Sequence, residues 1–404
     1  MEHNWAGNVA YQAREIARPR TLEAVRALVA ERALVRALGS RHSFSEVADG
    51  PGTLVSLAEL PEEITVSGEQ VSVPAATRYG VLAEFLQARG LALPNMASLP
   101  HISVAGAVAT GTHGSGDTLG SLSTAVAGLE LVTASGGLRR VWRGDPEFAG
   151  SVVALGALGL VTRVTLDVRP SFEVRQQVYV DVPWSDLVGD LWSVFASGYS
   201  VSVFTDWATP AQVWVKSLDA VALPFKPADG PVHMLAGESV TAVTEQGGVP
   251  GPWLSRLPHF RLGHKPSAGA ELQSEYLLPR ESAVEALGRL RAMAPRITPL
   301  LQISELRTVA ADTLWLSPAY GRDVLGVHFT WKLDVPGVTA LLPAVEEALV
   351  PLGARPHWGK VFHTTDVAPL YPRWTDFQEL RSHHDPKGKF TNPFLDRLAS
   401  DRRV

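Results

Sequence analysis

Along the first 170 residues, apolar positions switch repeatedly between helical and strand-like spacing. The apolar residues of segment 22–29 recur every three to four positions behind Thr21, a residue type that caps helices, so the spacing predicts a helix. A second helix is expected over 79–88, where Gly90 provides a stop signal. This mixture of elements predicts an α+β arrangement. Short apolar runs, several joined by glycine turns, predict strands over 33–38, 64–66, 71–73, 129–133, 138–141 and 161–168.

After Pro170 the pattern changes. Apolar and polar residues alternate over 172–180, as in a strand with one exposed face. The stretch 218–270 is rich in Pro, Gly and Ala and has few clear periodic elements. We therefore place a domain boundary near residue 170. In the second half we expect helices over 184–196, 280–294 and 338–350, and strands over 201–206, 212–217, 300–309 and 324–333.

The composition indicates a soluble globular protein that works without thiol chemistry. Of 404 residues, 46% are apolar and 19% are charged, and the net charge is −5, from 36 Lys and Arg against 41 Asp and Glu. This mild acidity argues against a general nucleic-acid binder. The absence of cysteine excludes disulfides, thiolate catalysis and cysteine-ligated zinc or iron–sulfur sites. The length indicates two or three domains.

The sequence contains no segment that predicts secretion or membrane insertion. Residues 1–5 lack the basic and apolar regions of a signal peptide. The most apolar stretch, Val152–Val168, is short and is interrupted by Arg163. We therefore expect a cytoplasmic, monomeric protein with neither a membrane nor a nucleic acid as partner.

Segment 38–44 (LGSRHSF) places His42 in a loop of small residues directly after a predicted strand. Backbone N–H groups in such a loop can form a concave binding site for an anion. The alternative is a surface turn with a solvent-facing histidine.

Segment 94–116 is a long run of small residues, and five glycines fall between 106 and 120. Small residues let the backbone approach a ligand closely and expose N–H donors to phosphate. Gly106 and Gly111 have the spacing of a nucleotide-triphosphatase loop, but Thr112 and His113 stand where that loop requires Lys and Ser or Thr. A Rossmann glycine pattern is also missing. The alternative is a glycine-rich connector.

Two predicted strands carry polar residues on one face. If 301–307 is a strand, Glu305 and Arg307 continue the face that holds Leu301 and Ile303. A charged pair on an apolar face is either paired in the core or lines a cavity. The alternative is a structural ion pair beside an ordinary core histidine. In the next strand, one face carries Gly326, His328 and Thr330, and the other carries Val327, Phe329 and Trp331.

Two further groups come from the C-terminal part of the chain. Lys360 follows Trp358-Gly359 and could reach into a pocket, the alternative being a solvated surface lysine. The adjacent His383-His384 pair has poor spacing for a metal, because neighbouring side chains point in different directions, and we predict no metal site.

Six segments, taken together and in order, resemble a known family. They are 39–44 (GSRHSF), 100–116 (PHISVAG…GTHGSG), 156–159 (GALG), 305–307 (ELR), 357–360 (HWGK) and 385–390 (DPKGKF). The chain is similar to the vanillyl-alcohol-oxidase/PCMH flavoprotein superfamily, and within it to the alditol oxidases, which are relatives of the sugar-lactone oxidases. The resemblance covers nearly the whole chain, from Asn4 onwards.

This resemblance implies both a fold and an activity. The fold is α+β, with a PCMH-type FAD-binding domain of two α+β subdomains over 1–170 and a substrate domain over 171–370 whose antiparallel sheet covers the flavin. A C-terminal segment, 371–404, returns to the FAD domain. The activity is oxidation of the terminal primary alcohol of alditols such as xylitol and sorbitol to the aldose. Hydride passes to flavin N5, and O2 is reduced to hydrogen peroxide.

By resemblance, His42 carries a covalent bond to FAD. Arg41 stands before it, where relatives more often have Gly. Some members of the superfamily tether FAD through a His and a Cys, and the lack of cysteine rules out that double tether here. The resemblance places the FAD contacts at Ala37, Leu38, Gly39, Ser40, Arg41, His42, Ser43, Ser98, Ser103, Gly106, Thr110, Gly111, Thr112, His113, Val161 and Asn392.

A buried polyol needs both donors and acceptors, because each unmatched polar group costs about 1–3 kcal/mol. Arg307 and Lys360, as cations, suit the stabilisation of a developing alkoxide, and Glu305 suits the orientation of Arg307. These three are the predicted catalytic residues. The predicted substrate-binding residues are Ser98, Gln273, Glu305, Arg307, His328, Thr330 and Lys360.

Three other interpretations share part of this pattern. A sugar-1,4-lactone oxidase or dehydrogenase would have the same fold and cofactor. A non-catalytic carbohydrate-binding flavoprotein would keep the pocket. A metal-dependent hydrolase would use His101, His113 and His357.

Overall fold

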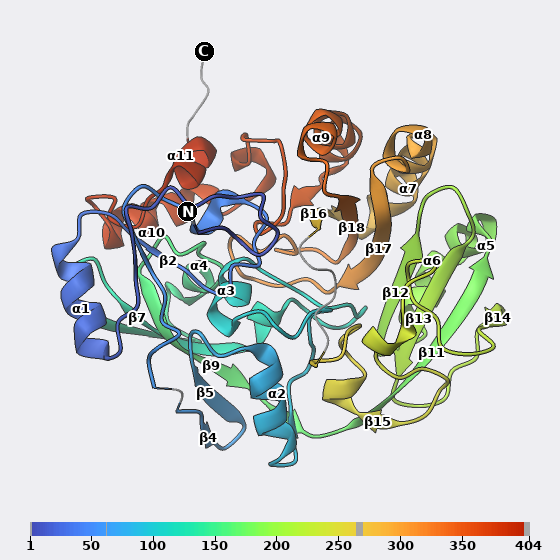
Figure 1. Ribbon diagram of the computed structural model, residues 1–404, viewed down its shortest axis with the longest axis horizontal. Coiled ribbons are helices and arrows are strands. Elements are labelled where there is room, and N and C mark those ends of the chain that lie inside the picture. Colours follow the sequence, from blue (N-terminus) through green and yellow to red (C-terminus); the bar gives the residue numbers. More distant parts are fainter. Residues whose placement is uncertain (1, 62, 264–269, 400–404) are drawn as a thin grey trace.

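The computed structural model describes residues 2–61, 63–263 and 270–399, and two systems of β-sheet organise these parts of the chain (Figure 1). The N-terminal half holds the smaller sheets, and the residues after 170 form one large antiparallel sheet. A cavity is lined by residues from both halves. The α+β class and the antiparallel sheet expected for the second half are confirmed.

The N-terminal half combines an antiparallel five-stranded sheet with a parallel three-stranded sheet. Val35 and Val55 of the small sheet share a hydrophobic cluster with Val132 and Leu160 of the larger one. The larger sheet contains, in spatial order, β4 (Thr65–Ser67), β5 (Gln70–Pro74), β9 (Leu160–Asp167), β7 (Val126–Val132) and β8 (Leu138–Trp142). The smaller contains β1 (Glu15–Ala17), β3 (Thr53–Val55) and β2 (Val35–Ala37), and β6 (Leu91–Ala92) pairs with β10 (Arg169–Pro170).

Two of the four helices in the described part of this half were expected from the sequence, and both begin at the expected residues. The Thr21 hydroxyl accepts a hydrogen bond from the backbone N–H of Ala24 (3.1 Å), which confirms the predicted cap. The helices are α1 (Leu22–Glu31), α2 (Tyr79–Gln87), α3 (Val104–Ala109) and α4 (Phe148–Val152).

The second half is built on a sheet in which β17 and β18 are central. Its strands, in spatial order, are β14 (Lys226–Pro227), β11 (Glu173–Val182), β13 (Ala211–Ser217), β12 (Ser200–Thr205), β17 (Leu301–Val309), β18 (Val324–Lys332), β16 (Glu271–Pro279) and β19 (Arg355–Pro356), while β15 (Gly251–Pro252) pairs with β11. The helices are α5 (Trp184–Gly189), α6 (Leu191–Ala196), α7 (Ala283–Ala292), α8 (Ala294–Ile297) and α9 (Val335–Leu349).

The alternation predicted for β18 is present, and it separates the core from the cavity. Val327, Phe329 and Trp331 are fully buried in the cluster that contains residues of α5, α6, α7 and α9. The rings of Phe329 and Trp331 stack with centroids 4.8 Å apart. Each such buried side chain contributes about 1.5–3 kcal/mol. The other face of the strand presents His328 and Thr330 to the cavity.

The register of three neighbouring strands aligns polar residues into rows across this cavity face. Glu305 of β17 pairs with His328 of β18, which pairs in turn with Glu275 of β16. Side chains directly opposite each other on one face lie about 4.5–5.5 Å apart at Cβ. The register therefore places two carboxylates on either side of one histidine.

The start of β17 differs from the prediction. Leu301 pairs with Trp331 and Ile303 pairs with Thr330, so β17 has one extra residue between these two pairs. Such a bulge reverses which face the following side chains occupy. Leu301 therefore packs in the core, and only Ile303 shares the cavity face with Glu305. The expectation that Leu301 lies on that face is wrong.

Three other segments depart from the predicted pattern. The segment 271–279 forms β16, although no strand was predicted there. The single helix expected over 184–196 is divided at Asp190 into α5 and α6, and the one expected over 280–294 is divided into a short 3₁₀ turn, α7 and α8.

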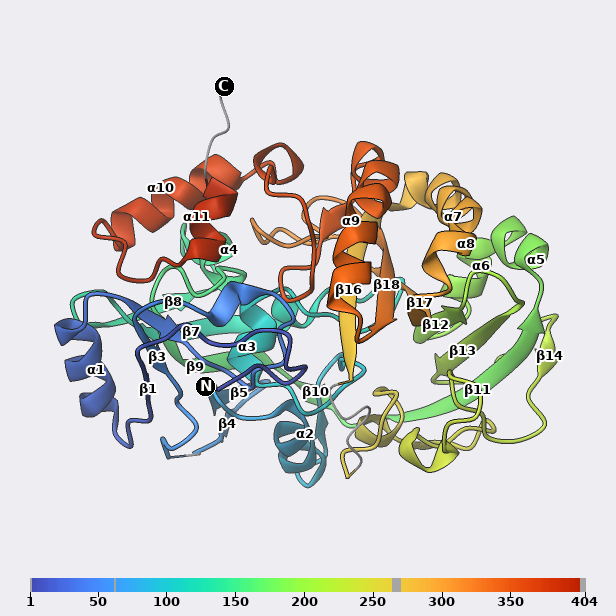
Figure 2. The same cartoon turned by 45° about the horizontal axis from the view of Figure 1, so that its top comes forward.

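The described C-terminal segment packs against the N-terminal half. Helix α10 (Trp374–His384) packs beside α4, and α11 (Pro393–Ala399) packs against the 3₁₀ turn at Glu46–Ala48; both helices are labelled in Figure 2. Phe377 and Leu395 belong to the same hydrophobic cluster as Val104 and Val152. Residues 400–404 of the predicted segment lie outside the described residues, and the domain boundaries stay a prediction.

Among the described residues, one helical stretch, Val335–Leu352, is long and apolar enough to cross a membrane. Val338, Leu342 and Val345 of this stretch are buried in the core of the second half. Packing against the sheet thus accounts for the apolar face of the helix.

Candidate cofactor and substrate site

A cavity of about 470 Å³ collects most of the residues singled out from the sequence. One wall comes from segments 36–48 and 97–113 of the N-terminal half, and the other from β16, β17, β18 and residues 357–360. All seven predicted substrate-binding residues line it. Of the predicted cofactor residues, Ala37, Leu38, Gly39, Ser40, Arg41, His42, Ser43, Ser98, Ser103, Gly106, Thr110, Thr112, His113 and Val161 line it.

Two predicted cofactor residues lie outside this lining. Gly111 adopts a positive φ of 67° and turns the chain after α3. Asn392 is buried, and its amide donates to the backbone carbonyls of Glu46 and Asp49, at 3.2 and 2.6 Å. Asn392 thus supports a loop that lines the cavity, and the FAD contacts of these two residues stay predictions.

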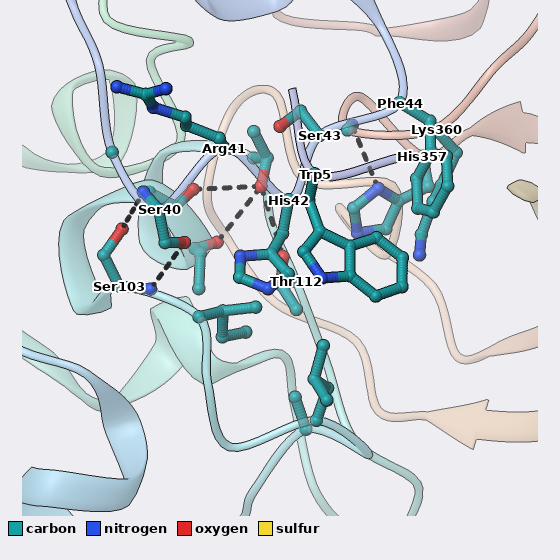
Figure 3. Close-up of a pocket in the computed structure, with 18 of the residues that line it drawn as sticks. Trp5, Ser40, Arg41, His42, Ser43, Phe44, Ser103, Thr112, His357 and Lys360 are labelled. Atoms are coloured by element: carbon teal, nitrogen blue, oxygen red, sulfur yellow. Dashed lines mark hydrogen bonds between the residues drawn. The ribbon is translucent and has the colours of Figure 1, made fainter. Parts of the chain in front are cut away.

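His42 has the properties of a buried, neutral nucleophile. Its Nδ1 is buried and has no hydrogen-bond partner. Burial lowers the pKa of the imidazole to about 4, with Arg78 and His101 acting in the same direction, so the ring is neutral at pH 7. The Trp5 ring stacks beside it with centroids 5.6 Å apart (Figure 3). The prediction of a solvent-facing histidine does not describe this site.

Arg41, directly before His42, has a left-handed backbone with φ of 66°. Glycine adopts this conformation without steric cost, whereas other residues need support from their surroundings. Here the Arg41 guanidinium pairs with Glu2 (2.5 Å), and the Arg41 carbonyl accepts a bond from the N–H of Trp5 (2.8 Å). The N-terminal segment thus holds the His42 loop in this conformation.

The loop after β2 and the start of α3 are held together by two serines. The N–H of Ser103 donates to the Ser40 hydroxyl (3.0 Å), and the N–H of Ser40 donates to the Ser103 hydroxyl (3.3 Å), as drawn in Figure 3. A Cβ on Gly39 or Gly106 would come within 2.8 Å of the Ser103 oxygen. Glycine is therefore required at both positions for this close approach. Because the N–H of Ser40 is already bonded to Ser103, the predicted anion site in segment 38–44 can use only the other backbone N–H groups of that loop.

The opposite wall is centred on Glu275, which was not predicted from the sequence. One carboxylate oxygen lies 2.5 Å from an Arg307 nitrogen and 3.3 Å from His113 Nε2. The other lies 3.4 Å from His328 Nδ1. Glu275 is thus the tighter partner of Arg307, because Glu305 lies 3.7 Å from it. Glu275 therefore takes the orienting role expected of Glu305.

The charges of this wall follow from burial and mutual pairing. Burial alone would raise the pKa of Glu275 and Glu305, but Arg307 and the neighbouring histidines together outweigh it, so the pKa of both carboxyls is lowered. Burial alone would lower the pKa of Arg307, but the two carboxylates raise it. Burial lowers the pKa of Lys360 to about 8, so this group is still mainly an ammonium at pH 7. Its nitrogen donates to the side-chain oxygen of Gln273.

The sequence contained a signal for some of the residues that were missed, but not for all of them. Glu271, Gln273 and Glu275 alternate with the buried Leu272 and Tyr276, which is the period of a strand with one polar face. His259 lies in the stretch without periodic elements and gave no such signal. His357 precedes the Trp-Gly-Lys motif, and its buried ring lies 5.9 Å from that of His113.

Only two of the three histidines of the metal-hydrolase interpretation are brought together. His113 and His357 group with Glu275, with ligand atoms within 4.8 Å of one another. His101 instead bonds the carbonyl of Leu262 through Nε2 (2.8 Å). The Arg307 guanidinium already forms an ion pair with Glu275 Oε1. A metal cation at that oxygen would be repelled by the positive charge of Arg307.

The fold and this site define an FAD-dependent oxidoreductase of the vanillyl-alcohol-oxidase/PCMH type. A family model for an FAD binding domain matches residues 14–141, and a model for D-arabinono-1,4-lactone oxidase matches 270–398. The cholesterol oxidase of B. sterolicum aligns with a TM-score of 0.79 at 17% identity, covering 98% of this chain and 96% of that one. At that identity the likeness concerns the fold.

Sequence relatives refine the class. An alditol oxidase from Streptomyces sp. is 50% identical over 406 residues, covering 97% of each chain. An L-gulono-1,4-lactone dehydrogenase from Mycobacterium tuberculosis is 28% identical over 98% of each chain. The L-gulonolactone oxidase of Bos taurus is 25% identical over 98% of this chain and 97% of that one. The chain belongs to the alditol oxidase family.

The residues present fit an FAD. The neutral His42 ring presents an orphaned Nδ1 at the cavity wall, and the small residues Gly39, Ser40, Ser103 and Gly106 line the same part of the cavity. The cavity then extends from this loop to the polar wall of β16, β17 and β18. One continuous space can therefore hold a flavin and a small polar substrate side by side.

Proposed function

We propose that this protein is an FAD-dependent oxidase that converts the terminal primary alcohol of alditols such as xylitol and sorbitol to the aldose. The observation that carries the proposal is the polar wall opposite His42, in which the buried Glu305 and Arg307 and the half-buried Gln273 and Lys360 face one cavity. When bound, FAD accepts a hydride equivalent from the alcohol and reduces O2 to hydrogen peroxide.

The wall offers the donors and acceptors that a polyol needs. Arg307 and Lys360 donate only, Glu305 accepts only, and Gln273 and Ser98 can do both. The Ser98 hydroxyl lies 3.4 Å from an Arg307 nitrogen, so these groups converge. Successive hydroxyls of an alditol would satisfy them, whereas an apolar substrate would leave them unmatched at about 1–3 kcal/mol each.

Positive charge in this wall suits the chemistry of the alcohol. Loss of the hydroxyl proton leaves negative charge on the C1 oxygen, and preorganised cations lower the free energy of that charge. Arg307 is held by Glu275 at 2.5 Å, and Lys360 by Gln273, so neither side chain needs to reorganise. The two cations bind and polarise the oxygen, while Glu305 accepts hydrogen bonds from neighbouring hydroxyls.

We also propose that FAD is attached covalently through His42. The support is the neutral ring with an unpartnered Nδ1 in the cavity wall. The cytoplasmic location and the monomeric state stay predictions.

An anaerobic titration of the purified holoprotein tests the activity. Xylitol is expected to bleach the yellow flavin band, and readmission of air is expected to restore it with one peroxide per xylitol oxidised. A sugar-1,4-lactone is the second candidate substrate, since the matched family model over 270–398 is that of a lactone oxidase. Bleaching by the lactone and not by xylitol would overturn the proposal. A flavin that no polyol or lactone bleaches would indicate the non-catalytic alternative.

A further inference from the structure

A buried lysine and a buried histidine lie behind Glu305. Lys216, on β13, is only 1% exposed and does not line the cavity. Lysine is rarely buried so completely unless its charge is paired. Its ammonium group donates to the carbonyl of Leu257 (2.5 Å) and lies 3.0 Å from His259 Nδ1. The other ring nitrogen of His259 lies 2.8 Å from Glu305 Oε1.

With Lys216 charged, the two hydrogen bonds of His259, to Lys216 and to Glu305, allow only one assignment of donors and acceptors. A lysine nitrogen can only donate when charged, so His259 Nδ1 must be the acceptor. The proton of the neutral imidazole then resides on Nε2, which donates to Glu305 Oε1. With the opposite tautomer, an N–H would face the ammonium group and a lone pair would face the carboxylate. Lys216 thus selects the tautomer of His259 that binds Glu305.

The fold holds both partners rigidly. Lys216 and Trp214 share the cavity-side face of β13, and the His259 ring packs edge-on against Trp214 and Phe204, with centroids 5.6 and 5.2 Å away. The Ser202 hydroxyl lies 3.3 Å from His259 Nε2. A ring held on three sides has little freedom to rotate, so the direction of its N–H is fixed with it.

Electrostatics favour the same arrangement over the physiological pH range. Burial lowers the pKa of His259 to about 4, with Lys216 acting in the same direction, so the ring is neutral. Burial lowers the pKa of Lys216 to about 7, while Glu305 opposes this shift. A neutral amine still has hydrogens to donate. It could also accept from Nδ1, but the ionised Glu305 can only accept, so the Nε2–H tautomer of His259 stays favoured when Lys216 loses its extra proton.

We propose that Lys216 and His259 are positioning residues that act through Glu305. They hold its Oε1, so that Oε2 is presented to the hydroxyls of the substrate in one orientation. The proposal rests on the proposed role of Glu305 in polyol binding. It assigns a function to two residues outside the motifs found in the sequence: His259 lines the cavity beside Glu305, and Lys216 supports His259 from behind the cavity wall.

A double-mutant cycle tests the activity side of this proposal. His259→Leu removes the donor and is expected to lower kcat/KM for xylitol by about tenfold to a hundredfold. His259→Gln, whose amide N–H can replace the Nε2–H, is expected to recover most of that loss. In the Glu305→Gln background, His259→Leu is expected to change kcat/KM by less than about twofold, because the partner through which it acts is already altered.

Ser304→Ala is the matched control. Ser304 precedes Glu305, is fully buried and accepts a hydrogen bond from Trp207 on the other face of β17 (2.8 Å). Its loss is expected to lower the thermal midpoint while leaving kcat/KM within about twofold. An undiminished effect of His259→Leu in the Glu305→Gln background would overturn the proposal, since His259 would then act independently of Glu305.

A spectroscopic test does not depend on catalysis. Long-range 1H–15N spectra of the histidine-labelled holoprotein are expected to show His259 protonated on Nε2 and unprotonated on Nδ1. In Lys216→Met, whose side chain has similar length and no donor, a population with the proton on Nδ1 is expected. Wild-type protein with the proton on Nδ1 would refute the inference even if xylitol oxidation is confirmed. A correct tautomer without any polyol oxidation would sink the proposed function instead.

Discussion

Lys360 lies between the Phe44 ring, 5.2 Å from its nitrogen, and the side chain of Gln273. Burial lowers the pKa of this lysine to about 8, while Glu275 opposes the shift. An ordinary surface lysine would stay charged to about pH 10. Burial in this site therefore makes Lys360 lose its positive charge just above neutral pH.

We expect the rate of flavin reduction by xylitol to fall as pH rises through about 8, because the ammonium form of Lys360 is the form that stabilises alkoxide charge. Lys360→Met is expected to lower the rate about a hundredfold to a thousandfold and to abolish this limb of the profile. Anaerobic stopped-flow absorbance across the neutral and alkaline range measures both. A wild-type rate that is flat through pH 8, or a mutant that keeps the same limb, would contradict the assignment.

His42 is the second residue whose chemistry comes from its surroundings. His42→Ala is expected to abolish covalent flavin, because no other ring nitrogen occupies its place in the loop. Flavin fluorescence on a denaturing gel reports the link directly. His101→Ala is the matched control, since His101 is bonded to Leu262 and is expected to leave the link intact. A fluorescent band for His42→Ala at wild-type intensity would disprove the attachment site.

At the scale of the elements, the site is a product of strand register. Gly326 lies one row from the Glu305–His328–Glu275 row and pairs with Arg307 across the sheet. A Cβ added at Gly326 would lie 3.5 Å from both Glu275 Oε1 and His113 Cε1, which is ordinary contact. A larger side chain would displace the carboxylate that orients Arg307. Gly326 thus leaves space for the Glu275–Arg307 ion pair, whose members come from β16 and β17.

Gly326→Ala is expected to leave kcat/KM within about threefold, while Gly326→Val is expected to lower it about tenfold to a hundredfold. The β-branched residue favours a strand, so the thermal midpoint is not expected to fall in parallel. Steady-state kinetics with xylitol and thermal unfolding, measured on both variants, separate the two effects. Equal activity of the alanine and valine variants would show that the Glu275–Arg307 pair tolerates displacement.

At the scale of the whole molecule, Arg36 joins segments that are far apart in the sequence. Its buried guanidinium donates to the carbonyls of Val47, Leu155 (2.7 Å), Gly156 (3.1 Å) and Phe390 (2.7 Å). Burial lowers its pKa to about 10, so it is charged at pH 7. One side chain thereby ties the C-terminal segment to two loops of the N-terminal half.

Arg36→Met is expected to destabilise the holoprotein by about 3–5 kcal/mol, because several buried carbonyls lose their donor at once. Chemical denaturation monitored by circular dichroism measures the loss. Arg20→Met serves as control: Arg20 is largely exposed, and the loss of its pairing with Glu59 (2.9 Å) is expected to leave the stability nearly unchanged. A change for Arg36→Met no larger than for Arg20→Met would show that the C-terminal segment is held by its apolar contacts alone.

Local periodicity predicted much of this fold and part of the site. The helices behind Thr21 and over 79–88, and the two faces of β18, are present because each depends on spacing within a few residues. The extra residue of β17 reversed the face of Leu301, since a bulge arises from pairing with a neighbouring strand. The division of 184–196 at Asp190 likewise left no periodic signal.

The sequence by itself determined the class of fold, the small-residue loop that carries His42, and the absence of any thiol chemistry. The tertiary structure decided that Glu275 orients Arg307, that Arg41 is held by the N-terminal segment, and that Lys216 and His259 support Glu305. The physical reason is the range of the interactions. Spacing and turn chemistry act within one element, whereas buried charges must find partners, and the folded chain supplies those partners from distant segments.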